Sequence, residues 1–302
     1  MNNVGYQADF LGTDKLVELP QISPEWQELV VRSDRLRNRE ILDYPNYSVV
    51  MNQETRQAFF SAANVNFKNN VGRGRSFRVD TRIDISLQLD NIYYKDLNNT
   101  ENPFDRGHLT RRAAVAWGPT RKLANDASKD SCFFTNISLQ HKNFNQDEWH
   151  ALERAIENTN KDADDKFNIF TGPIFSPLDR FISPTRNLKP ARVPSGFWKI
   201  ISYIGRDSKE IETNAFIVFQ DETAIRAMKQ VLNNPQINPF EVFQTSTTHI
   251  ENLTGIIFPE ILFNRNPLFF FDSDITQENG ISTPQSNRVT PLEDDSKIIF
   301  SQ

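Results

Sequence analysis

The alternation of apolar runs and polar turns along this chain predicts a β-sheet as its main structural element. Residues 47–51 and 56–62 are apolar runs separated by the polar stretch 52–55, which indicates a β-hairpin. Later runs with the length and β-branched content of strands occupy residues 166–170, 196–205 and 214–220. The sequence therefore predicts strands distributed over the middle of the chain.

Two further segments are strand candidates because of the types of their side chains. In residues 77–83 arginines alternate with apolar or small residues, so Arg78 and Arg82 would leave a strand on one face. Residues 132–137 are rich in aromatic and β-branched side chains. The polar, glycine-containing residues 66–74 predict a loop before the first of these segments.

Helical spacing of apolar side chains is confined to short segments. Trp149, Leu152 and Ile156 repeat at three and four residues, which predicts a helix over residues 147–158. Further helices are expected at residues 24–34, as two short helices within 109–130, at 222–232 and at 248–253. The helices are thus expected to be short additions to the sheet.

The two ends of the chain differ from its middle. Residues 1–45 are polar and interrupted by prolines, and we expect an N-terminal arm packed on the domain. Residues 272–302 are rich in serine, aspartate, asparagine, glutamine and threonine, which predicts a polar, loosely ordered tail. Because no composition shift divides the stretch between them, residues 46–271 are expected to form one domain.

The formal net charge of −5 argues against broad electrostatic adhesion to nucleic acid. Any contact with phosphate would therefore depend on a local cluster of basic side chains. Two clusters are present, one of Arg73, Arg75, Arg78 and Arg82 and the other of Arg106, Arg111, Arg112, Arg121 and Lys122. A solvated, charged loop is the simpler explanation for the outer members of these clusters.

The cysteine content and the lengths of the apolar runs indicate the cellular compartment in which the protein is expected. The single cysteine, Cys132, excludes an intramolecular disulfide, and its apolar neighbours indicate a buried thiol. The first nine residues lack the basic and apolar segments of a signal peptide, and no run approaches a membrane span. We therefore expect a cytoplasmic protein without membrane association, with export by a route that needs no signal peptide as the alternative.

The candidate chemistry begins at residues 104–109, whose sequence is FDRGHL. His108 is one of four histidines, and a neutral imidazole can accept a proton from water near neutral pH. Gly107 would let the backbone turn tightly, so that the base and the cation of Arg106 are presented together. This combination suits attack on a phosphodiester, whereas a structural or surface role is the simpler explanation for a histidine in isolation.

A second group of candidate residues lies in the predicted helix at 147–158 and just before it. Asn145 and Glu153 are eight positions apart, which places their side chains about 80° apart around a helix axis. Mg²⁺ prefers oxygen ligands and retains several waters, so an amide oxygen and a carboxylate that holds metal-bound waters form a workable shell. A helix N-cap is the simpler explanation for Asn145. His141 and His150 have no companions at zinc-ligand spacing.

The order of these residues resembles the DNA/RNA non-specific endonucleases, an endonuclease G-like family of ββα-metal nucleases. The resemblance is carried by residues 105–109, by Thr135, Asn136 and Gln140, and by residues 145–153, with weaker similarity over about 45–262. It implies an α+β fold of the ββα-metal (His-Me finger) type, with a central, mainly antiparallel sheet flanked by helices. Leu139 stands where family members usually have proline, a difference that concerns loop stiffness more than chemistry.

The resemblance also implies a role for each matching residue of the reaction centre. His108 would be the general base, Asn145 the direct ligand of Mg²⁺, and Glu153 a ligand through water. Mn²⁺ would be a substitute for Mg²⁺. Asn136 would fix the hydrogen bonds around the base.

Substrate binding is assigned to arginines by the same resemblance. Arg106 would support both the phosphate and the metal site. The upstream phosphate-binding arginine of the family matches Arg78 best, with Arg82 as the alternative.

These assignments predict a metal-dependent endonuclease that hydrolyses phosphodiester bonds in DNA and RNA with little sequence specificity. His108 would deprotonate water for in-line attack, and contacts to phosphates rather than bases would explain the weak specificity. One alternative is a catalytically silent nucleic-acid-binding or scaffold protein with the same fold. Another is a sequence-specific HNH-type nuclease, which would need a recognition module that neither end of the chain resembles.

The expected partners follow from the same prediction. DNA and RNA would be substrates, and the resemblance implies a homodimer as one form of assembly. An indiscriminate nuclease without a secretion signal would attack its own genome. We therefore hypothesise restraint by an inhibitor or regulatory partner, by gated assembly, by specialised export or by deployment as a defence effector.

Overall fold

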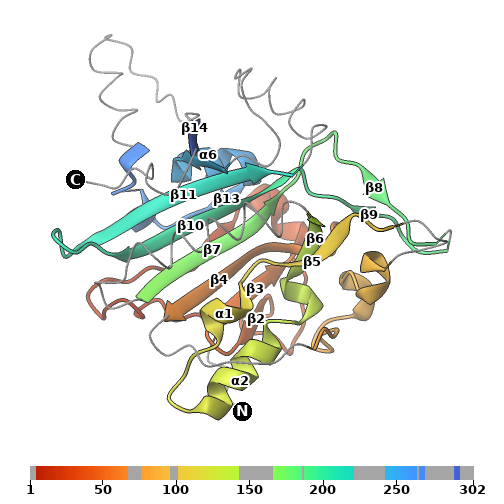
Figure 1. The fold of residues 1–302 in the computed structure, drawn as a ribbon, viewed down its shortest axis with the longest axis horizontal. Helices are drawn as coiled ribbons and strands as arrows, with labels where there is room; N and C mark the ends of the chain where they lie inside the picture. The colour runs from red at the N-terminus through yellow and green to blue at the C-terminus, as the bar shows by residue number, and fades with distance from the viewer. Residues whose placement is uncertain are drawn as a thin grey trace, which may run out of the picture.

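A large antiparallel sheet forms the centre of the computed structural model (Figure 1). The structure describes residues 5–66, 76–95, 101–142, 166–185, 187–220, 242–263 and 265–268, and the backbone of residues 289–292. In these residues the sheet has eight strands in the order β14-β12-β11-β10-β7-β4-β3-β2, and all its pairings are antiparallel. The expected α+β fold with a mainly antiparallel sheet is therefore confirmed.

Five of the eight strands in the described part of this sheet were predicted, whereas β2, β12 and β14, the last within the expected polar tail, were not. The bounds of the eight strands are β2 (Ile41–Tyr44), β3 (Tyr47–Met51), β4 (Ala58–Asn66), β7 (Lys166–Ile174), β10 (Gly196–Ile204), β11 (Ile211–Phe219), β12 (Val242–Thr245) and β14 (Val289–Leu292). The predicted hairpin is formed by β3 and β4, and the three later predicted strands are β7, β10 and β11. Strand β2 lies within the stretch expected to be an arm, where it pairs with β3 at the edge of the sheet.

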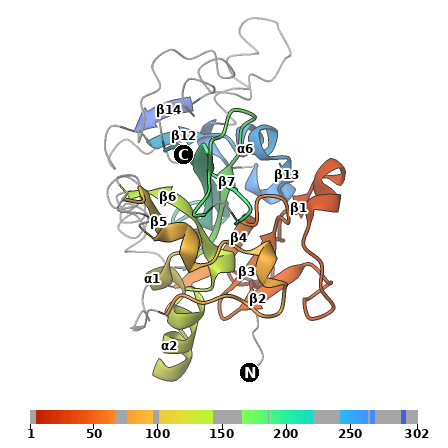
Figure 2. The ribbon, with the colours of Figure 1, turned by 90° about the vertical axis from the view of Figure 1, so that its right-hand side faces the viewer.

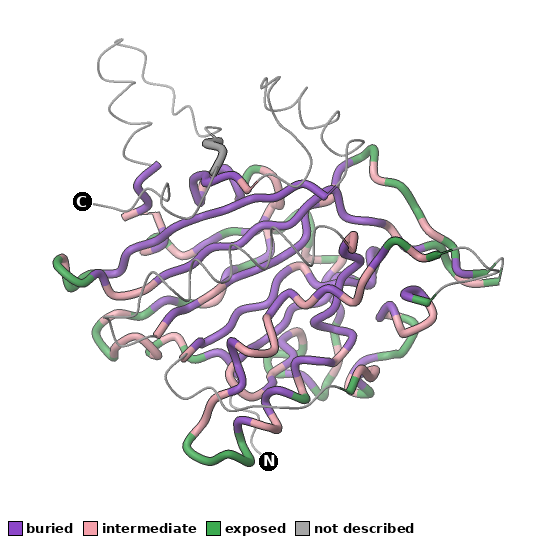
Figure 3. The backbone as a smooth tube through the Cα atoms, in the orientation of Figure 1, coloured by how far each residue is buried: buried purple, intermediate pink, exposed green. Residues whose placement is uncertain are grey.

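Both faces of the sheet are covered, so its long strands are buried along most of their length (Figure 3). On one face lie α1 (Arg112–Val115), which contacts β4, and α2 (Arg121–Asp130), which contacts α1. These are the two short helices predicted within residues 109–130. On the other face Trp198 and Phe170 pack with residues of the N-terminal arm and of α6 (Thr247–Thr254). Alternation along β10 explains both layers, because Phe197 and Ile201 face one cluster while Trp198 and Ile200 face the other.

A smaller unit packs beside the sheet and contains two further antiparallel pairs, the first of which is labelled in Figure 2. Its elements are η3 (Ile85–Leu87), η4 (Asn91–Tyr94), β5 (Phe104–His108), η5 (Phe134–Asn136), β6 (Ile137–His141), β8 (Phe181–Ile182) and β9 (Ala191–Arg192). Strand β5 pairs with β6, and β8 pairs with β9. Phe104, Phe134 and Leu139 are buried together in a core of their own.

Two strand predictions in this region were wrong. Residues 77–83 contain a single bridge, between Arg78 and Phe133, because the Asp80 carboxylate accepts the Arg82 backbone N–H at 2.9 Å and forms a local turn. Residues 132–137 form the end of a turn and the 3-10 helix η5, and strand β6 begins only at Ile137. Side-chain and turn bonds therefore override the β propensity of both segments.

The remaining helix predictions have different outcomes. The first predicted helix is a shorter 3-10 helix, η1 (Pro24–Leu29), followed along the chain by β2. Helix α6 is confirmed, and it ends at Gly255 in the left-handed conformation with φ 66°. After it comes β13 (Ile256–Ile257), which pairs with β1 (Gln21–Ile22). The helices predicted over residues 147–158 and 222–232 lie outside the described residues, and the described helices include none long and apolar enough to cross a membrane.

Candidate functional site

The β5–β6 hairpin carries the first part of the predicted motif. Successive side chains of a strand point to opposite faces, so His108, Arg106 and Phe104 share one face of β5. In the antiparallel register Arg106 lies opposite Leu139, and His108 lies opposite Ile137. The structure therefore brings the predicted base and one predicted phosphate ligand to the same surface.

Gly107 has a different role from the tight turn that we expected. It lies within strand β5, opposite Ser138, and its φ is not positive. A Cβ atom at this position would lie 2.1 Å from Oε1 and Cδ of Gln140. Glycine is required because the buried side chain of Gln140 occupies the space above its Cα atom, and the expectation of a turn was wrong.

The imidazole of His108 lies between a sulfur atom and an aromatic ring. Its Nε2 is 3.6 Å from Sγ of Cys132, and its ring centroid is 5.6 Å from that of Phe77. Cys132 is a free, buried thiol, as the sequence predicted. The contact between Cys132 and His108 was not predicted, because twenty-four residues separate them and no local pattern signals it.

Asn136 is fully buried and fixes the chain on both sides of the hairpin. Its Oδ1 accepts the backbone N–H of Thr110 at 2.9 Å, and its Nδ2 donates to the carbonyls of Thr110 and Ser131 at 2.9 and 2.8 Å. Its own carbonyl accepts the N–H of Leu109 at 2.9 Å. Because Leu109 follows His108 directly, these bonds restrain the backbone that carries the imidazole.

Arg106 is held beside His108 by an amide and a ring. Its Nε donates to Oδ1 of Asn91 at 2.8 Å, and its guanidinium carbon lies 5.2 Å from the centroid of Phe77. Phe77 therefore contacts both side chains of the candidate site. A cation above an aromatic face is favourable, and the contact orients the guanidinium.

Arg78 lies near the start of the smaller unit that contains the β5–β6 hairpin, against the end of α2. Its guanidinium is ion-paired with Asp130, donates to the carbonyl of Lys129 at 3.1 Å and lies 3.9 Å from the ring centroid of Phe133. Burial raises the pKa of the Asp130 carboxyl, and Arg78 offsets only part of that rise. The side chain of Arg78 retains 36% of its exposure, so part of it faces solvent.

Arg82 is placed differently from Arg78, although four residues separate them. Its guanidinium donates to the carboxylate of Asp80 at 2.7 Å and to the carbonyl of Asp43 at 2.8 Å. It also lies 4.5 Å from the ring centroid of Tyr44. The structure therefore does not bring Arg82 together with Arg78 on one strand face, and it bonds Arg82 to the edge strand β2 instead.

The hairpin is attached to the large sheet by two glutamines that sequence reasoning missed. Oε1 of Gln57 accepts the N–H of Leu139 at 3.1 Å. Oε1 of Gln220 accepts the N–H of His141 at 2.9 Å, and its Nε2 donates to the carbonyl of Leu139 at 3.1 Å. These side chains satisfy backbone groups on the edge of β6 that β5 does not pair.

The predicted metal ligands Asn145 and Glu153 lie outside the described residues. Within the described ranges, histidine, cysteine, aspartate and glutamate side chains form no group of three that could hold a metal ion. One polar side chain of β6 is buried without partners in the described part of the chain. The amide of Gln140 is fully buried, and among the described residues neither its oxygen nor its nitrogen has a hydrogen-bond partner.

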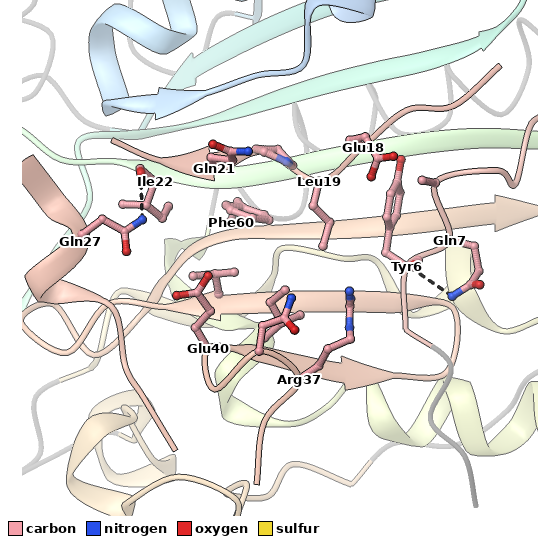
Figure 4. A pocket seen from close by; sticks show the side chains of 15 residues that line it. Tyr6, Gln7, Glu18, Leu19, Gln21, Ile22, Gln27, Arg37, Glu40 and Phe60 are labelled. Carbon is pink, nitrogen blue, oxygen red and sulfur yellow. Dashed lines mark hydrogen bonds between the residues drawn. The ribbon is translucent and has the colours of Figure 1, made fainter. Parts of the chain in front are cut away.

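A separate cavity of about 750 Å³ lies away from these residues (Figure 4). Tyr6, Glu18, Leu19 and Arg37 of the N-terminal arm line it together with Phe60 of β4. None of the predicted site residues that the structure describes contributes to its lining. The candidate site is thus the face of the hairpin that carries the partly exposed His108 and Arg106, and not this cavity.

Comparisons with known proteins bear on the family and the fold of this chain. The chain is 30% identical over 231 residues to an uncharacterised protein of Sinorhizobium fredii (strain NBRC 101917 / NGR234); the match covers 73% of this chain. The matched part is 34% of that relative, so the chain spans about a third of the length of the curated relative it matches.

A solved structure and a family model give the fold and the family. A crystal structure of the EndoG/EndoGI complex, which concerns the mechanism of EndoG inhibition, matches with a TM-score of 0.54 at 16% identity and covers 72% of this chain and 84% of that one. At this identity the likeness shows the fold. The model of the DNA/RNA non-specific endonuclease family matches residues 30–263. The chain therefore belongs to the DNA/RNA non-specific endonuclease family.

Proposed function

We propose that this chain is a metal-dependent endonuclease that hydrolyses phosphodiester bonds of DNA and RNA with little sequence specificity. The observation that carries the proposal is the shared face of β5, where His108 and Arg106 project from one short strand. A base beside a cation is the arrangement that hydrolysis of a phosphodiester needs. Family membership and the fold shared with EndoG support the same activity.

His108 is the general base in this proposal. Its Nε2 faces the sulfur of Cys132, so we assign the ring hydrogen to Nε2, as a donor to sulfur. Nδ1 then carries the lone pair that takes a proton from the attacking water. Asn136 is a positioning residue, because its bonds fix the backbone around Leu109 and Thr110.

The two proposed phosphate ligands are Arg106 and Arg78. Arg106 stands on the same strand face as His108 and is oriented by Asn91 and Phe77. Arg78 is ion-paired but keeps an exposed part, so it would contact phosphate from that side. We assign Arg82 a structural role, since its guanidinium is bonded to Asp80 and to β2.

The residues fit a hydrated Mg²⁺, with Mn²⁺ as a substitute. The proposed donors, an amide oxygen of Asn145 and a carboxylate of Glu153 acting through water, are the hard oxygen ligands that Mg²⁺ prefers. The unpartnered amide of Gln140 does not contribute to this site, because the strand register places it with Gly107 on the face of the hairpin opposite to His108. When bound, the cation would neutralise charge developing on the phosphate and on the leaving oxygen.

The proposed partners are DNA and RNA as substrates and an inhibitor as a regulator. The matched structure concerns inhibition of EndoG by a bound partner, which supports an inhibitor as the means of restraint for this chain too. A homodimer and a cytoplasmic location stay predictions. A catalytically silent binding protein is the alternative that the first experiment separates from the nuclease.

The test is cleavage of supercoiled plasmid DNA and of RNA with Mg²⁺ or with EDTA. We expect cleavage with Mg²⁺, none with EDTA, and a rate lower by about 10² to 10⁴ in His108→Ala. His141→Asn is the matched control, because His141 lies at the other end of the same hairpin. Near-normal cleavage by His108→Ala would overturn the assignment of the base, and binding without cleavage would favour the silent protein.

A further inference from the structure

Residues 176–192, which we call the 176–192 ridge, expose apolar side chains and positive charge together. Leu178 and Phe181 are 64% and 63% exposed, more than any other large apolar side chain in the described part of the chain. Arg180 lies between them and is also exposed. The described residues of the ridge include three basic side chains, Arg180, Lys189 and Arg192, and one acidic side chain, Asp179, a net charge of +2, whereas the whole chain carries −5. This surface therefore differs from the rest in both hydrophobicity and charge.

Hydrogen bonds to Asp179, the single acidic residue of the ridge, fix the turn at which the ridge begins. Oδ2 of Asp179 accepts the N–H of Ser176 at 2.8 Å and Nε of Arg192 at 3.0 Å, while the hydroxyl of Ser195 donates to Oδ1. The Asp179 side chain is 1% exposed. Its charge is thus buried and paired, and the turn that presents Leu178 and Arg180 is held in place.

The second half of the ridge, at Lys189, is hydrogen-bonded to the unit that carries the candidate site. The carbonyl of Lys189 accepts bonds from the hydroxyl of Tyr93 at 2.8 Å and from Arg56 at 3.0 Å. Tyr93 belongs to η4, whose first residue, Asn91, binds Arg106. The ridge and Arg106 are therefore fixed to the same short helix.

The ridge is also continuous with the catalytic face of β5, and β8 and β9 lie beside β5 and β6 in Figure 1. The guanidinium carbon of Arg180 is 5.1 Å from the ring centroid of Phe104. Phe104 is on the same strand face as His108, four residues away, or about 14 Å along the strand. The separation of roughly 14 Å between Phe104 and His108 corresponds to about four steps of a DNA strand, which advances about 3.4 Å per phosphate along the duplex axis.

We propose that the 176–192 ridge is a nucleic-acid contact of this site, in which Arg180 binds a backbone phosphate and Phe181 packs on a base or sugar. The inference rests on the proposed function and extends it from the reacting phosphate to the flanking strand. An exposed aromatic side chain beside a cation is the composition that binds single strands without reading sequence. The positive charge of the ridge and its continuity with the candidate site favour this occupant over a second copy of the chain.

The test measures binding without turnover, in the His108→Ala background. Fluorescence anisotropy with a labelled single strand and with its duplex gives the Kd at a series of salt concentrations. We expect Phe181→Ala to raise the Kd for the single strand by about 5- to 150-fold. We expect Arg180→Gln to reduce the slope of log K against log salt by about 0.7 on the single strand and 0.9 on the duplex.

The matched control is Ile257→Ala, which removes an apolar side chain that is 44% exposed on β13. In Figure 2 the β1–β13 pair lies on the opposite side of the molecule from β5 and β6. If both ridge variants bind with unchanged affinity while the unmutated protein cleaves normally, the inference is overturned and the proposed function is not. A change in sedimentation mass in Phe181→Ala, without weaker binding, also overturns it in favour of a contact between copies. Weaker binding by the ridge variants supports the inference even where the unmutated protein does not cleave, which would refute only the proposed function.

Discussion

The eight-stranded sheet and the β5–β6 hairpin are both antiparallel, but they are stabilised in different ways. Strands β10 and β11 pair along nine residues, and both faces of the sheet carry buried aromatic and aliphatic side chains. The hairpin pairs along only five residues. The other edge of β6 is bonded by the side chains of Gln57 and Gln220 in place of a further strand.

This difference separates stability from chemistry. Apolar burial is non-directional, so the sheet stabilises the fold through many contacts. No single one of these contacts determines the position of a side chain. Hydrogen bonds are directional, and a few of them determine where His108 lies. Substitutions in the sheet should therefore change the free energy of unfolding, while substitutions around the hairpin should change the cleavage rate more than that free energy.

The largest expected effect on stability is at the centre of the sheet. Trp198 is fully buried, and its ring packs edge-on against Phe258 with centroids 5.3 Å apart. Trp198→Ala should lower the free energy of unfolding by about 3–5 kcal/mol. Urea denaturation measures this loss, and the cleavage rate per folded molecule should remain normal. A rate that falls much further than the folded fraction would contradict the separation of the two regions.

A smaller loss of stability with a larger loss of activity is expected at the hairpin. Asn136→Ala removes three side-chain hydrogen bonds and should cost roughly 2–3 kcal/mol. Asn64 in β4 is the matched control, because its buried amide also makes three bonds, two with Gln7 and one with Asn168. Both variants should lose similar stability in urea, but only Asn136→Ala should cleave slowly when fully folded. Equal rates in the two variants would show that Asn136 is merely structural.

The packing of Gly107 against Gln140 gives the next smaller effect. Gly107→Ala places a Cβ atom 2.1 Å from the Gln140 side chain and should destabilise the protein by about 1–3 kcal/mol. Adding Gln140→Ala removes the clashing atoms, so the double variant should regain much of the loss. Thermal unfolding of the two single variants and the double variant measures the coupling. Simple additivity would mean that another contact requires the glycine.

The sequence predicted the sheet better than the unit that carries the site. Strands β3, β4, β7, β10 and β11 were predicted because apolar patterns are local and burial on two faces leaves a continuous signal. The strand predicted at residues 77–83 was wrong, since Asp80 forms a local turn with Arg82, and Arg78 bonds to the carbonyl of Lys129, which is distant in sequence. No periodicity reports such partners.

The candidate site shows the same limit. The motif identified His108, Arg106 and Asn136, and the structure places them on or beside one hairpin. The same motif could not report that Cys132 and Phe77 surround the imidazole, because these contacts depend on how the turn after α2 and the segment that carries Phe77 meet β5. The assignments of Asn145 and Glu153 stay predictions, since both lie outside the described residues.

The smallest expected effect is a pH dependence at the junction of the two regions. Asp80 accepts bonds from Tyr44 of β2 and from Arg82, and the Tyr44 hydroxyl also lies 2.6 Å from Oγ1 of Thr135, next to Asn136. Burial by itself raises the pKa of the Asp80 carboxyl, but the hydrogen bonds from Arg82 and Tyr44 outweigh it and hold the pKa below its ordinary value.

A lowered pKa in the folded state means that ionised Asp80 stabilises the protein at neutral pH. This contribution is complete above the ordinary value of about 3.9 and is lost as the pH falls from there through the lower pKa of the folded protein. Asp80→Asn should therefore be less stable than the unmutated protein at pH 7 and should lose less stability on further acidification. Melting temperatures across that range measure the two slopes. Parallel slopes would assign the acid sensitivity to other carboxyls and would remove Asp80 as the electrostatic link between the edge strand and the hairpin.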